Sequence, residues 1–271
     1  MTDLRIAIAG AGGRMGAANI RAVAATPGLV VHAAFDRPGS SAIGRDTGEF
    51  AGLGKLGIAI GDDPEAALDG ADAIIDFTAP AVSVLLAELA ASRELIDIVG
   101  TTGCSKEEDW SIQKAGSAGA RIVKSGNFSL GVNLLLGLVR QAAAALPAYD
   151  IEILEMHHNK KVDAPSGTAL MLGRAAAAGR GIDLDANAVR ARDGHTGARV
   201  PGSIGFQALR GGAVVGDHTV ILAGETERIE ITHRAQDRGM FAAGAMQAAL
   251  WAKDQPAGFY SMADVLGFSE T

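Results

Sequence analysis

The stretch Leu4-Arg-Ile-Ala-Ile-Ala-Gly-Ala-Gly-Gly-Arg-Met-Gly16 decides the fold of this chain. Its first half is a short apolar run of the kind expected for a buried parallel strand. The glycines that follow have the spacing G-x-x-G-x-x-G, and a helical pattern over Ala17–Ala25 and a second strand over Leu29–Phe35 come next. A strand, a glycine turn, a helix and a strand within about 30 residues predict a βαβ unit.

The glycine turn has the chemistry of a dinucleotide-binding site. Glycines permit a tight turn and let the backbone approach a pyrophosphate at the N-terminus of the following helix. Asp36 ends the second strand, where a carboxylate accepts hydrogen bonds from an adenine ribose, and Arg37 is placed to hold a 2′-phosphate. The alternatives are a glycine turn without a cofactor and a solvated arginine. The sequence therefore predicts NADH or NADPH as cofactor and leaves the choice between them open.

Helix signals separate the next predicted strands. Asp63 precedes Pro64 as an N-cap with proline at the first helical position. Val82–Ala91 has a helical pattern, and Ser105-Lys-Glu-Glu108 has the form of a capping box. Gly39–Gly57 is glycine-rich and weakly patterned, so we predict a loop there.

Three predicted strands in this part of the chain end in small polar residues. The exits are Asp-Phe-Thr at 76–78, Gly-Thr-Thr-Gly at 100–103 and Ser-Gly-Asn-Phe at 125–128. In open α/β sheets, ligands lie in the crevice outside the carboxyl ends of the strands. Ordinary turn chemistry explains any one of these exits equally well, but three in succession favour a ligand site.

The character of the chain changes after residue 128. A long helical pattern, Leu130–Leu146, ends at Pro147, and a strand, a helix and three strands separated by glycine-rich turns follow. These segments are Ile151–His157, Thr168–Arg180, Ser203–Leu209, Val214–Leu222 and Arg228–His233. Gly239–Lys253 returns to a helical pattern.

We therefore predict an α/β protein with two domains. Residues 1–128 form a Rossmann-type parallel-sheet domain that binds the dinucleotide, and the C-terminal helix at 239–271 packs back on it. Residues 129–238 form an α+β domain with a mixed or antiparallel sheet, for substrate binding.

Composition narrows the class of partner. The formal net charge of -7 argues against a general nucleic-acid binder, whose affinity depends on a basic face. No apolar stretch approaches the roughly 20 residues of a membrane span, and Met1–Arg5 lacks the features of a signal peptide. The single cysteine, Cys104, excludes an internal disulfide and fits a reducing cytosol. We expect a cytoplasmic protein with a small-molecule partner, without nucleic-acid or membrane binding.

Candidate chemistry is concentrated in the stretch from Glu152 to Ala169. Two histidines and two lysines lie at the end of a predicted strand, ahead of a turn that leads into a helix: His157, His158, Lys160 and Lys161. Such a cluster is typical of an anion site that also moves protons, and its mutual repulsion is destabilising unless an anion is bound. A metal site is the alternative, but no third ligand has the usual spacing.

A carboxylate ligand suits this cluster. The Lys161 ammonium, the Ser166 hydroxyl and backbone N–H groups at the start of the helix would hold one carboxylate, and His158 the same or a second one. Either His157 or Lys161 would supply a proton. We expect Asp163 to orient the turn or to pair with a lysine.

The stretch Glu152–Ala169 resembles the hallmark motif of the 4-hydroxy-tetrahydrodipicolinate reductase (dihydrodipicolinate reductase) family of lysine biosynthesis. Further motifs follow in the family's order: Gly10–Gly16, Asp36-Arg37, Asp76–Thr78, Gly100–Gly103, Asn127–Ser129, Val215–Thr219 and Glu230–His233. The resemblance implies reduction of 4-hydroxy-tetrahydrodipicolinate to tetrahydrodipicolinate by NADPH or NADH, with hydride transfer to C4 and loss of water. It also implies a homotetramer joined through the sheet of the second domain, with a hinge between domains.

The resemblance assigns the site residues. Cofactor binding is implied for Gly10, Ala11, Gly12, Gly13, Arg14, Met15, Asp36, Arg37, Gly100, Thr101, Thr102, Ser125, Gly126, Asn127 and Phe128. The cyclic dicarboxylate is implied to contact His158, Lys161, Ser166, Gly167 and Thr168, with His157 and Lys161 as proton donors and no metal. The chain departs from the family in carrying Ala79 where many members have arginine, Asn159-Lys160 in place of a more basic pair, and Asp36 in place of the commoner glutamate.

Two other functions explain part of the sequence. Another Rossmann-type amino-acid dehydrogenase, such as one acting on aspartate, would account for the nucleotide half but not for the stretch His157–Thr168. A non-catalytic NAD(H) sensor would need a basic DNA-reading element, and none is apparent.

Overall fold

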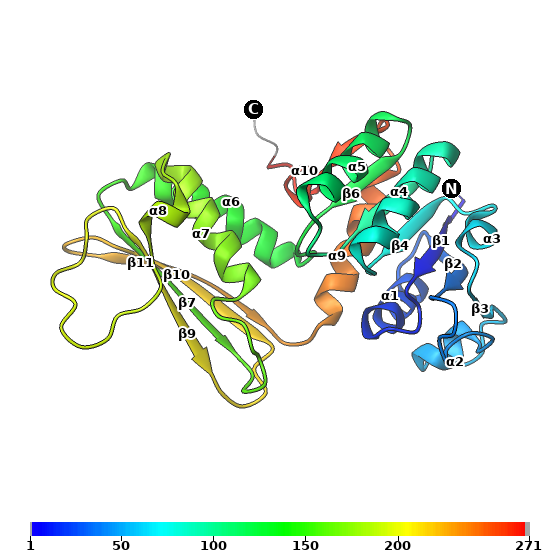
Figure 1. Ribbon diagram of the computed structural model, residues 1–271, viewed down its shortest axis with the longest axis horizontal. Coiled ribbons are helices and arrows are strands. Elements are labelled where there is room, and N and C mark those ends of the chain that lie inside the picture. Colours follow the sequence, from blue (N-terminus) through cyan, green and yellow to red (C-terminus); the bar gives the residue numbers. More distant parts are fainter. Residues whose placement is uncertain (1, 269–271) are drawn as a thin grey trace. The chain divides into compact units, whose positions relative to one another are not determined.

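The computed structural model describes residues 2–268, and its chain divides into two compact units (Figure 1). Unit 1 comprises the described residues up to Leu130 together with those from Gly239 onward, and unit 2 spans Gly131–Arg238. Residues 1 and 269–271, which the predicted domain ranges include, lie outside the described residues.

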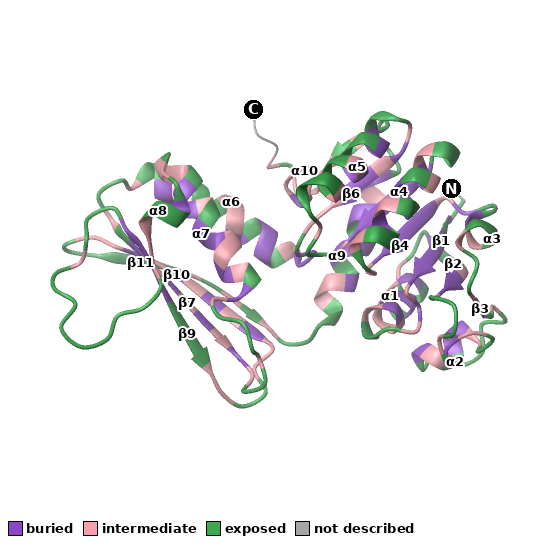
Figure 2. Cartoon of the chain, viewed as in Figure 1, coloured by how far each residue is buried: buried purple, intermediate pink, exposed green. Residues whose placement is uncertain are grey.

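Unit 1 is built on a parallel sheet, which confirms the predicted Rossmann-type fold. Within residues 2–268 this sheet has seven strands in the order β12-β6-β5-β4-β1-β2-β3. Their bounds are β1 (Leu4–Ala9), β2 (Leu29–Phe35), β3 (Ile60–Gly61), β4 (Ala73–Asp76), β5 (Ile96–Val99), β6 (Arg121–Lys124) and β12 (Gly258–Tyr260). The apolar runs of the sequence correspond to strands buried on both faces (Figure 2).

Helices cover both faces of this sheet. They are α1 (Arg14–Ala25), α2 (Thr47–Ala51), α3 (Pro64–Leu68), α4 (Pro80–Arg93), α5 (Lys106–Ser117), α9 (Gly239–Ala252) and α10 (Met262–Val265). One apolar cluster joins alternate strand residues such as Ile6 to Ile20 of α1 and Met246 of α9. A second joins the remaining strand residues to Leu86 of α4 and Ile112 of α5. This two-sided core keeps the carboxyl ends of the strands at one edge.

Two predicted helix starts are confirmed, and one predicted loop is wrong in part. The Asp63 carboxylate accepts from the N–H groups of the first turn of α3, and Ser105 and Glu108 form the reciprocal capping box of α5. Within the predicted loop Gly39–Gly57, residues 47–51 form α2. Asp46 causes this helix, because its carboxylate accepts from Gly48 N and Glu49 N at one end and from Leu56 N and Gly57 N across the loop.

Unit 2 has a mixed sheet, as predicted, in the order β11-β10-β7-β9-β8. The strands are β7 (Asp150–His157), β8 (Ala188–Val189), β9 (Ile204–Arg210), β10 (Gly216–Ala223) and β11 (Arg228–Ala235). β7, β9 and β8 are parallel, whereas β10 is antiparallel to both β7 and β11. The helices of this unit are α6 (Leu130–Ala145), α7 (Gly167–Arg180) and α8 (Leu184–Asn187).

Only one face of the unit 2 sheet is covered by helices (Figure 1). Ile153, Phe206 and Val220 are buried beneath Leu135 of α6 and Leu172 of α7. Side chains of the opposite face alternate with these and stay half-buried or exposed. No helix of the described chain is long and apolar enough to cross a membrane.

Candidate active site

The turn between β1 and α1 requires its glycines. Gly10 has a φ of 66°, in the left-handed region, and a Cβ at Gly16 would lie 2.3 Å from the Gly10 carbonyl oxygen. A Cβ at Gly12 would lie 2.2 Å from Oδ2 of Asp36. The turn is therefore packed against its own helix and against the end of β2, and a side chain at either Gly12 or Gly16 would disrupt it.

The N-terminus of α1 has no anionic partner within its own first turn. Gly13 is the N-cap and provides no side-chain hydrogen bond, and the first turn, which begins with Arg14 and Met15, contains no acidic residue. The first N–H groups of a helix carry a partial positive charge. Together with the tight turn, this end of α1 fits a pyrophosphate.

Asp36 lies at the end of β2 with its carboxylate fixed beside the turn. Its oxygens accept from Gly12 N at 3.1 Å, Arg37 N at 2.8 Å and Ser40 Oγ at 2.8 Å. Ser40 was not predicted as part of this site, because a serine in a glycine-rich loop carries no distinguishing pattern. With three of its roughly four lone-pair sites used, the carboxylate keeps one on Oδ1 for a ribose hydroxyl.

The segments that follow β4 and β5 are joined by a hydrogen bond. Thr78 N donates to Thr101 Oγ1 at 2.9 Å and to the buried Asp76 carboxylate at 3.1 Å. Burial raises the pKa of Asp76, and the hydrogen bonds from neighbouring hydroxyl groups oppose that rise. A Cβ at Gly100 would lie 2.3 Å from the Phe77 ring. Thr101 is buried, and its hydroxyl holds the segment after β4 in place. Thr102 is exposed at the same edge of the sheet.

The exit of β6 is a compact turn against α9. Ser125 Oγ donates to the Asn127 carbonyl at 2.7 Å, and Asn127 Oδ1 accepts from Ser129 N at 2.8 Å. Phe128 is buried beside Phe77, with ring centroids 5.5 Å apart, and its carbonyl would lie 1.7 Å from a Cβ at Gly244. Gly126 is exposed at the tip. The registers of β4 with β5 and β5 with β6 place all three predicted exits at one edge.

At the carboxyl end of β7 in unit 2, two alternate residues point to the helix-covered side of the sheet. Glu155 is 1% exposed and His157 is 9% exposed, and His157 Nδ1 lies 2.5 Å from Glu155 Oε2. Arg210, at the end of β9, donates two hydrogen bonds of 2.8 Å to the same carboxylate. Sequence reasoning missed Arg210, which the parallel register of β7 and β9 places opposite His157.

His218 of β10 completes the buried part of this cluster. Its Nε2 lies 3.0 Å from Ser166 Oγ, and its ring makes an edge contact with His157 at 5.1 Å between centroids. Burial and the neighbouring His157 lower the pKa of His218 to about 4, so it is neutral near pH 7. The Ser166 hydroxyl also accepts from Ala169 N at 3.1 Å as the N-cap of α7.

The loop between β7 and α7 carries the other predicted residues. Lys161 Nζ donates to both oxygens of Asp163, at 2.7 and 2.8 Å, which confirms that Asp163 pairs with a lysine and lowers the pKa of Asp163. His158 is half-buried just beyond β7. Gly167 and Thr168 form the first residues of α7, downstream of the Ser166 N-cap. The structure therefore brings all the predicted substrate residues to one end of unit 2.

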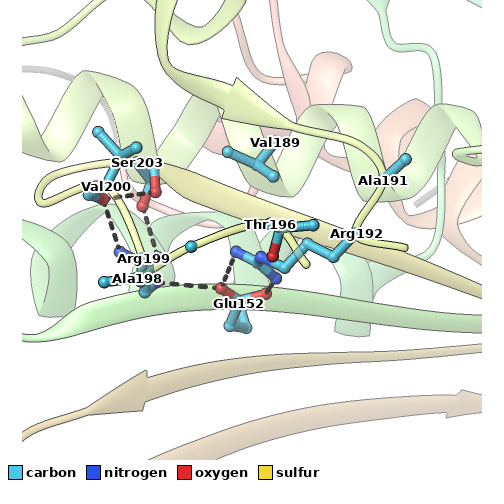
Figure 3. Close-up of a pocket in the computed structure, with 10 residues that line it drawn as sticks. Glu152, Val189, Ala191, Arg192, Thr196, Ala198, Arg199, Val200 and Ser203 are labelled. Carbon is cyan, nitrogen blue, oxygen red and sulfur yellow. Dashed lines mark hydrogen bonds and ion pairs between the residues drawn. The ribbon is translucent and has the colours of Figure 1, made fainter. Parts of the chain in front are cut away.

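A hollow of about 440 Å³ lies elsewhere in unit 2, around Glu152 and the loop that follows β8 (Figure 3). Arg192 donates to both Glu152 oxygens at 2.8 Å, and Arg199 pairs with Glu152 and Asp150. Because these arginines are already neutralised, the hollow lacks the free donors of an anion site. Residues 2–268 contain no group of three or more His, Cys, Asp or Glu side chains that could hold a metal ion.

Comparison with known proteins gives a consistent result over the whole chain. Family models described as dihydrodipicolinate reductase, N-terminus and C-terminus, match residues 4–128 and 131–266. A 4-hydroxy-tetrahydrodipicolinate reductase of Rhizobium rhizogenes is 60% identical over 268 residues, which cover 98% of this chain and 97% of the relative. One from Agrobacterium fabrum is 59% identical, with 99% and 98% covered.

Solved structures share the fold at lower identity. A dipicolinate-bound dihydrodipicolinate reductase from Paenisporosarcina sp. TG-14 superposes with a TM-score of 0.78 at 22% identity, covering 96% of this chain and 98% of that one. An amine dehydrogenase from Mycobacterium smegmatis reaches a TM-score of 0.58 at 13% identity, with 95% and 94% covered. The fold is thus common to dehydrogenases with different substrates, and fold alone does not select one.

Proposed function

The chain belongs to the dihydrodipicolinate reductase family, and from this we propose that it reduces 4-hydroxy-tetrahydrodipicolinate to tetrahydrodipicolinate in the diaminopimelate route to lysine. The observation that carries the proposal is the 60% identity to a reductase of that name over nearly the full length of both chains. The basic end of β7 supports it, because an aspartate dehydrogenase or an NAD(H) sensor gives no reason for His157, His158 and Lys161 to stand together.

A nicotinamide nucleotide fits unit 1 of this oxidoreductase. The Gly10–Gly16 turn, the uncapped start of α1 and the Asp36 carboxylate are suited to a pyrophosphate and a ribose. When bound, the reduced nicotinamide supplies the hydride. We propose that the residues holding the nucleotide are Gly10, Ala11, Gly12, Gly13, Arg14, Met15, Asp36, Arg37, Gly100, Thr101, Thr102, Ser125, Gly126, Asn127 and Phe128.

Asp36 favours NADH over NADPH in this proposal. Its carboxylate is fixed by Gly12 N, Arg37 N and Ser40 Oγ, where ribose hydroxyls would donate to it and a 2′-phosphate would be repelled. The Arg37 guanidinium offers a phosphate some compensation. We therefore expect turnover with both nucleotides and a higher kcat/KM with NADH.

The cyclic dicarboxylate is proposed to bind at the β7–α7 loop. Lys161 already holds the Asp163 carboxylate, and a substrate carboxylate would take its place at Nζ. His158 and the start of α7, with Ser166, Gly167 and Thr168, would contribute the remaining contacts. The Ser166 hydroxyl is engaged with Ala169 N and His218, so its contribution is to fix the start of the helix.

His157 is the proposed proton donor. As hydride reaches C4, the 4-hydroxyl group leaves and needs one proton to depart as water. The His157 ring is fixed by Glu155 on its Nδ1 side, whereas Lys161 carries the charge that attracts the dicarboxylate. This division assigns proton transfer to the imidazole and binding to the ammonium.

We propose a cytoplasmic homotetramer joined through the uncovered face of the unit 2 sheet. Leu154 and Met156 of β7, Leu209 of β9 and Ile221 of β10 share this face and are half-buried or exposed in the single chain. Contiguous apolar side chains on one sheet face are typical of a subunit interface. The single thiol, Cys104, suits a reducing compartment.

The proposal is tested by supplying the purified protein with freshly made product of dihydrodipicolinate synthase, and by following nucleotide oxidation with NADH and NADPH in parallel. We expect oxidation with both nucleotides and none when oxaloacetate and ammonium, the pair that an aspartate dehydrogenase would reduce, replace the substrate. Absence of turnover with both nucleotides would refute the proposed reaction, and turnover with NADPH alone would refute the proposed preference.

A further inference from the structure

Glu155 is a buried carboxylate with a full set of donors and no proposed contact with either reactant. It accepts two hydrogen bonds from Arg210 at 2.8 Å, one from Ser166 N at 3.0 Å and one from His157 Nδ1 at 2.5 Å. It is 1% exposed, so these donors replace water almost completely. A buried ion pair of this kind adds little to stability compared with apolar packing. Stability alone therefore does not explain this pair, and a role in the site does.

The Glu155 carboxylate fixes which nitrogen of His157 carries a hydrogen. Burial opposes ionisation of Glu155, but Arg210 and His157 together hold its pKa below the usual value. An ionised carboxylate only accepts, so Nδ1 must be the donor. Nε2 then points away from Glu155, and a Cβ at Gly216 would lie 3.0 Å from it. Glycine at 216 leaves space at the nitrogen that is free to exchange a proton.

Arg210 connects this ring to the substrate loop. The guanidinium that grips Glu155 also donates to the Asp163 carbonyl at 2.7 Å. Asp163 in turn holds Lys161 Nζ. One arginine therefore sets the position of both groups to which the reaction is assigned, from the end of a strand that is itself in register with β7.

The second buried histidine has no such partner. His218 binds Ser166 Oγ rather than a carboxylate, and its low pKa keeps it neutral. It packs edge-on against the His157 ring at 5.1 Å and so restricts rotation of that ring. Of the two, His157 is the histidine that is oriented for proton transfer.

We propose that Glu155, braced by Arg210, is the positioning residue that holds His157 with Nδ1 protonated and Nε2 directed to the reactant. This inference rests on the proposed function, in which His157 gives the proton to the departing hydroxyl. Glu155 touches no reacting atom, and its effect on proton transfer passes through the His157 ring.

The kinetic test is a double-mutant cycle between Glu155→Gln and His157→Gln. We expect Glu155→Gln to lower kcat by about 10- to 100-fold, with KM for the nucleotide within about twofold of wild type. In the His157→Gln background, Glu155→Gln should cause no further loss, because its effect passes through the missing ring. Glu152→Gln is the matched control, since Glu152 is also a β7 glutamate paired with an arginine but lies on the opposite face.

The structural test reads the ring directly and does not depend on turnover. In protein labelled with ¹⁵N-histidine, the His157 signal is identified by its loss in His157→Gln. At about pH 8.5, above the ordinary titration range of imidazole, we expect a protonated Nδ1 in the wild type and loss of that signature in Glu155→Gln. Arg210→Lys, which keeps the charge but not the bidentate grip, should give a smaller loss of kcat. The part of this loss that passes through the His157 ring should vanish in the His157→Gln background, and the part that passes through Asp163 and Lys161 should remain.

An unprotonated Nδ1 in the wild type would overturn the inference. So would a normal kcat for Glu155→Gln, or losses that simply multiply in the double variant. If Glu155→Gln does not fold, Arg210→Lys and the wild-type ¹⁵N spectrum decide the matter. A wild-type protein that shows the expected ring signature but no turnover would refute the proposed reaction and leave the positioning of His157 established.

Discussion

His157 and Lys161 are each paired with a carboxylate, but the two carboxylates differ in burial. Glu155 is buried and braced by Arg210, whereas Asp163 lies on the surface. An exposed ion pair contributes little free energy and is readily replaced, while a buried pair with further hydrogen bonds is not. These differences suit His157 to a fixed orientation and Lys161 to the exchange of one carboxylate for another.

Replacing Lys161 should separate catalysis from nucleotide binding. We expect Lys161→Ala to lower kcat/KM for the dicarboxylate by about 100-fold or more, because a charge-assisted contact to the reactant is lost. The dissociation constant for NADH, measured by fluorescence titration, should stay within about twofold of wild type, since the residues proposed to hold the nucleotide belong to unit 1.

The neighbouring Lys160 provides the control for that variant. It is exposed and carries no assigned role, so Lys160→Ala should keep kcat/KM within about threefold of wild type. If Lys161→Ala instead weakened NADH binding while leaving the reaction of bound substrate intact, the role given to Lys161 would be wrong.

Asp97 is a carboxyl group buried in the core of unit 1 on the strand β5. It is fully buried, and among the described residues neither of its oxygens has a hydrogen-bond partner. Burial raises its pKa well above the usual value, with a smaller contribution from Asp76. Its register neighbours on β4 and β6 are Ile74 and Ile122. We expect Asp97→Val to raise the free energy of unfolding at pH 7 by about 1–3 kcal/mol.

The stability difference between Asp97→Val and the wild type should depend on pH. Because the folded-state pKa of Asp97 is raised, its contribution to stability is largest below its unfolded value of 3.8 and declines as pH rises toward the folded value. The advantage of Asp97→Val over wild type should therefore grow as pH rises from about 4. Urea titrations at several pH values measure it, and an advantage that shrinks with pH would contradict this account.

The candidate site could be predicted as far as residues that are close in sequence. His157, His158, Lys161 and the start of α7 form one continuous motif, so their chemistry is visible without a structure. Arg210 and His218 are 53 and 61 positions beyond His157, and it is the pairing of β9 and β10 with β7 that brings them to the cluster. Spacing alone gives no reason to connect them with His157.

At the scale of elements, Glu94 is the C-cap of α4, and replacing this residue by glycine should stabilise the protein. Glu94 has a φ of 55° and donates its N–H to the Ala90 and Ala91 carbonyls as the C-cap. It is the sole non-glycine residue with positive φ in the part of the chain that the structure describes. A Cβ is disfavoured in this conformation, so Glu94→Gly should stabilise unit 1 by about 0.5–1 kcal/mol in thermal unfolding.

The opposite change at α7 is the control. Gly181 is a C-cap with a φ of 64°, and a Cβ there would meet nothing within 4 Å. Gly181→Ala should therefore destabilise the protein by about 1 kcal/mol through conformation alone. Equal melting temperatures for wild type, Glu94→Gly and Gly181→Ala would show that these caps do not limit stability.

Long elements could be predicted from the sequence and short ones could not. The predicted β2 has the bounds of the observed strand, and the predicted helix Leu130–Leu146 is one residue longer than α6. The prediction missed α2, β3 and β12, which have two to five residues each. Periodicity needs several turns or alternations to appear, and these elements are fixed by distant partners such as Asp46 and β6 instead.

At the scale of the whole molecule, the uncovered sheet face of unit 2 is where oligomerisation should be lost first. Leu209 is 47% exposed and lies beside Met156 on that face. We expect Leu209→Glu to convert the proposed tetramer into smaller species in sedimentation velocity, because a charge in an apolar interface is strongly unfavourable. Circular dichroism of the variant should remain that of a folded α/β protein.

Trp110→Glu is the control for a general effect of surface charge. Trp110 is 62% exposed on α5 and belongs to unit 1, whereas the proposed interface is formed by unit 2. This variant should sediment like the wild type. A monomeric wild type, or a Leu209→Glu protein that remains tetrameric, would contradict the proposed interface.

The most direct test of the central claim is to follow deuterium from the nucleotide into the product. With NADH dideuterated at C4 of the nicotinamide and freshly made 4-hydroxy-tetrahydrodipicolinate, the tetrahydrodipicolinate formed should carry one deuterium at its C4, as seen by mass spectrometry and NMR. Nucleotide oxidation that leaves the product unlabelled, or no product at all, would contradict the assignment of this chain as the reductase.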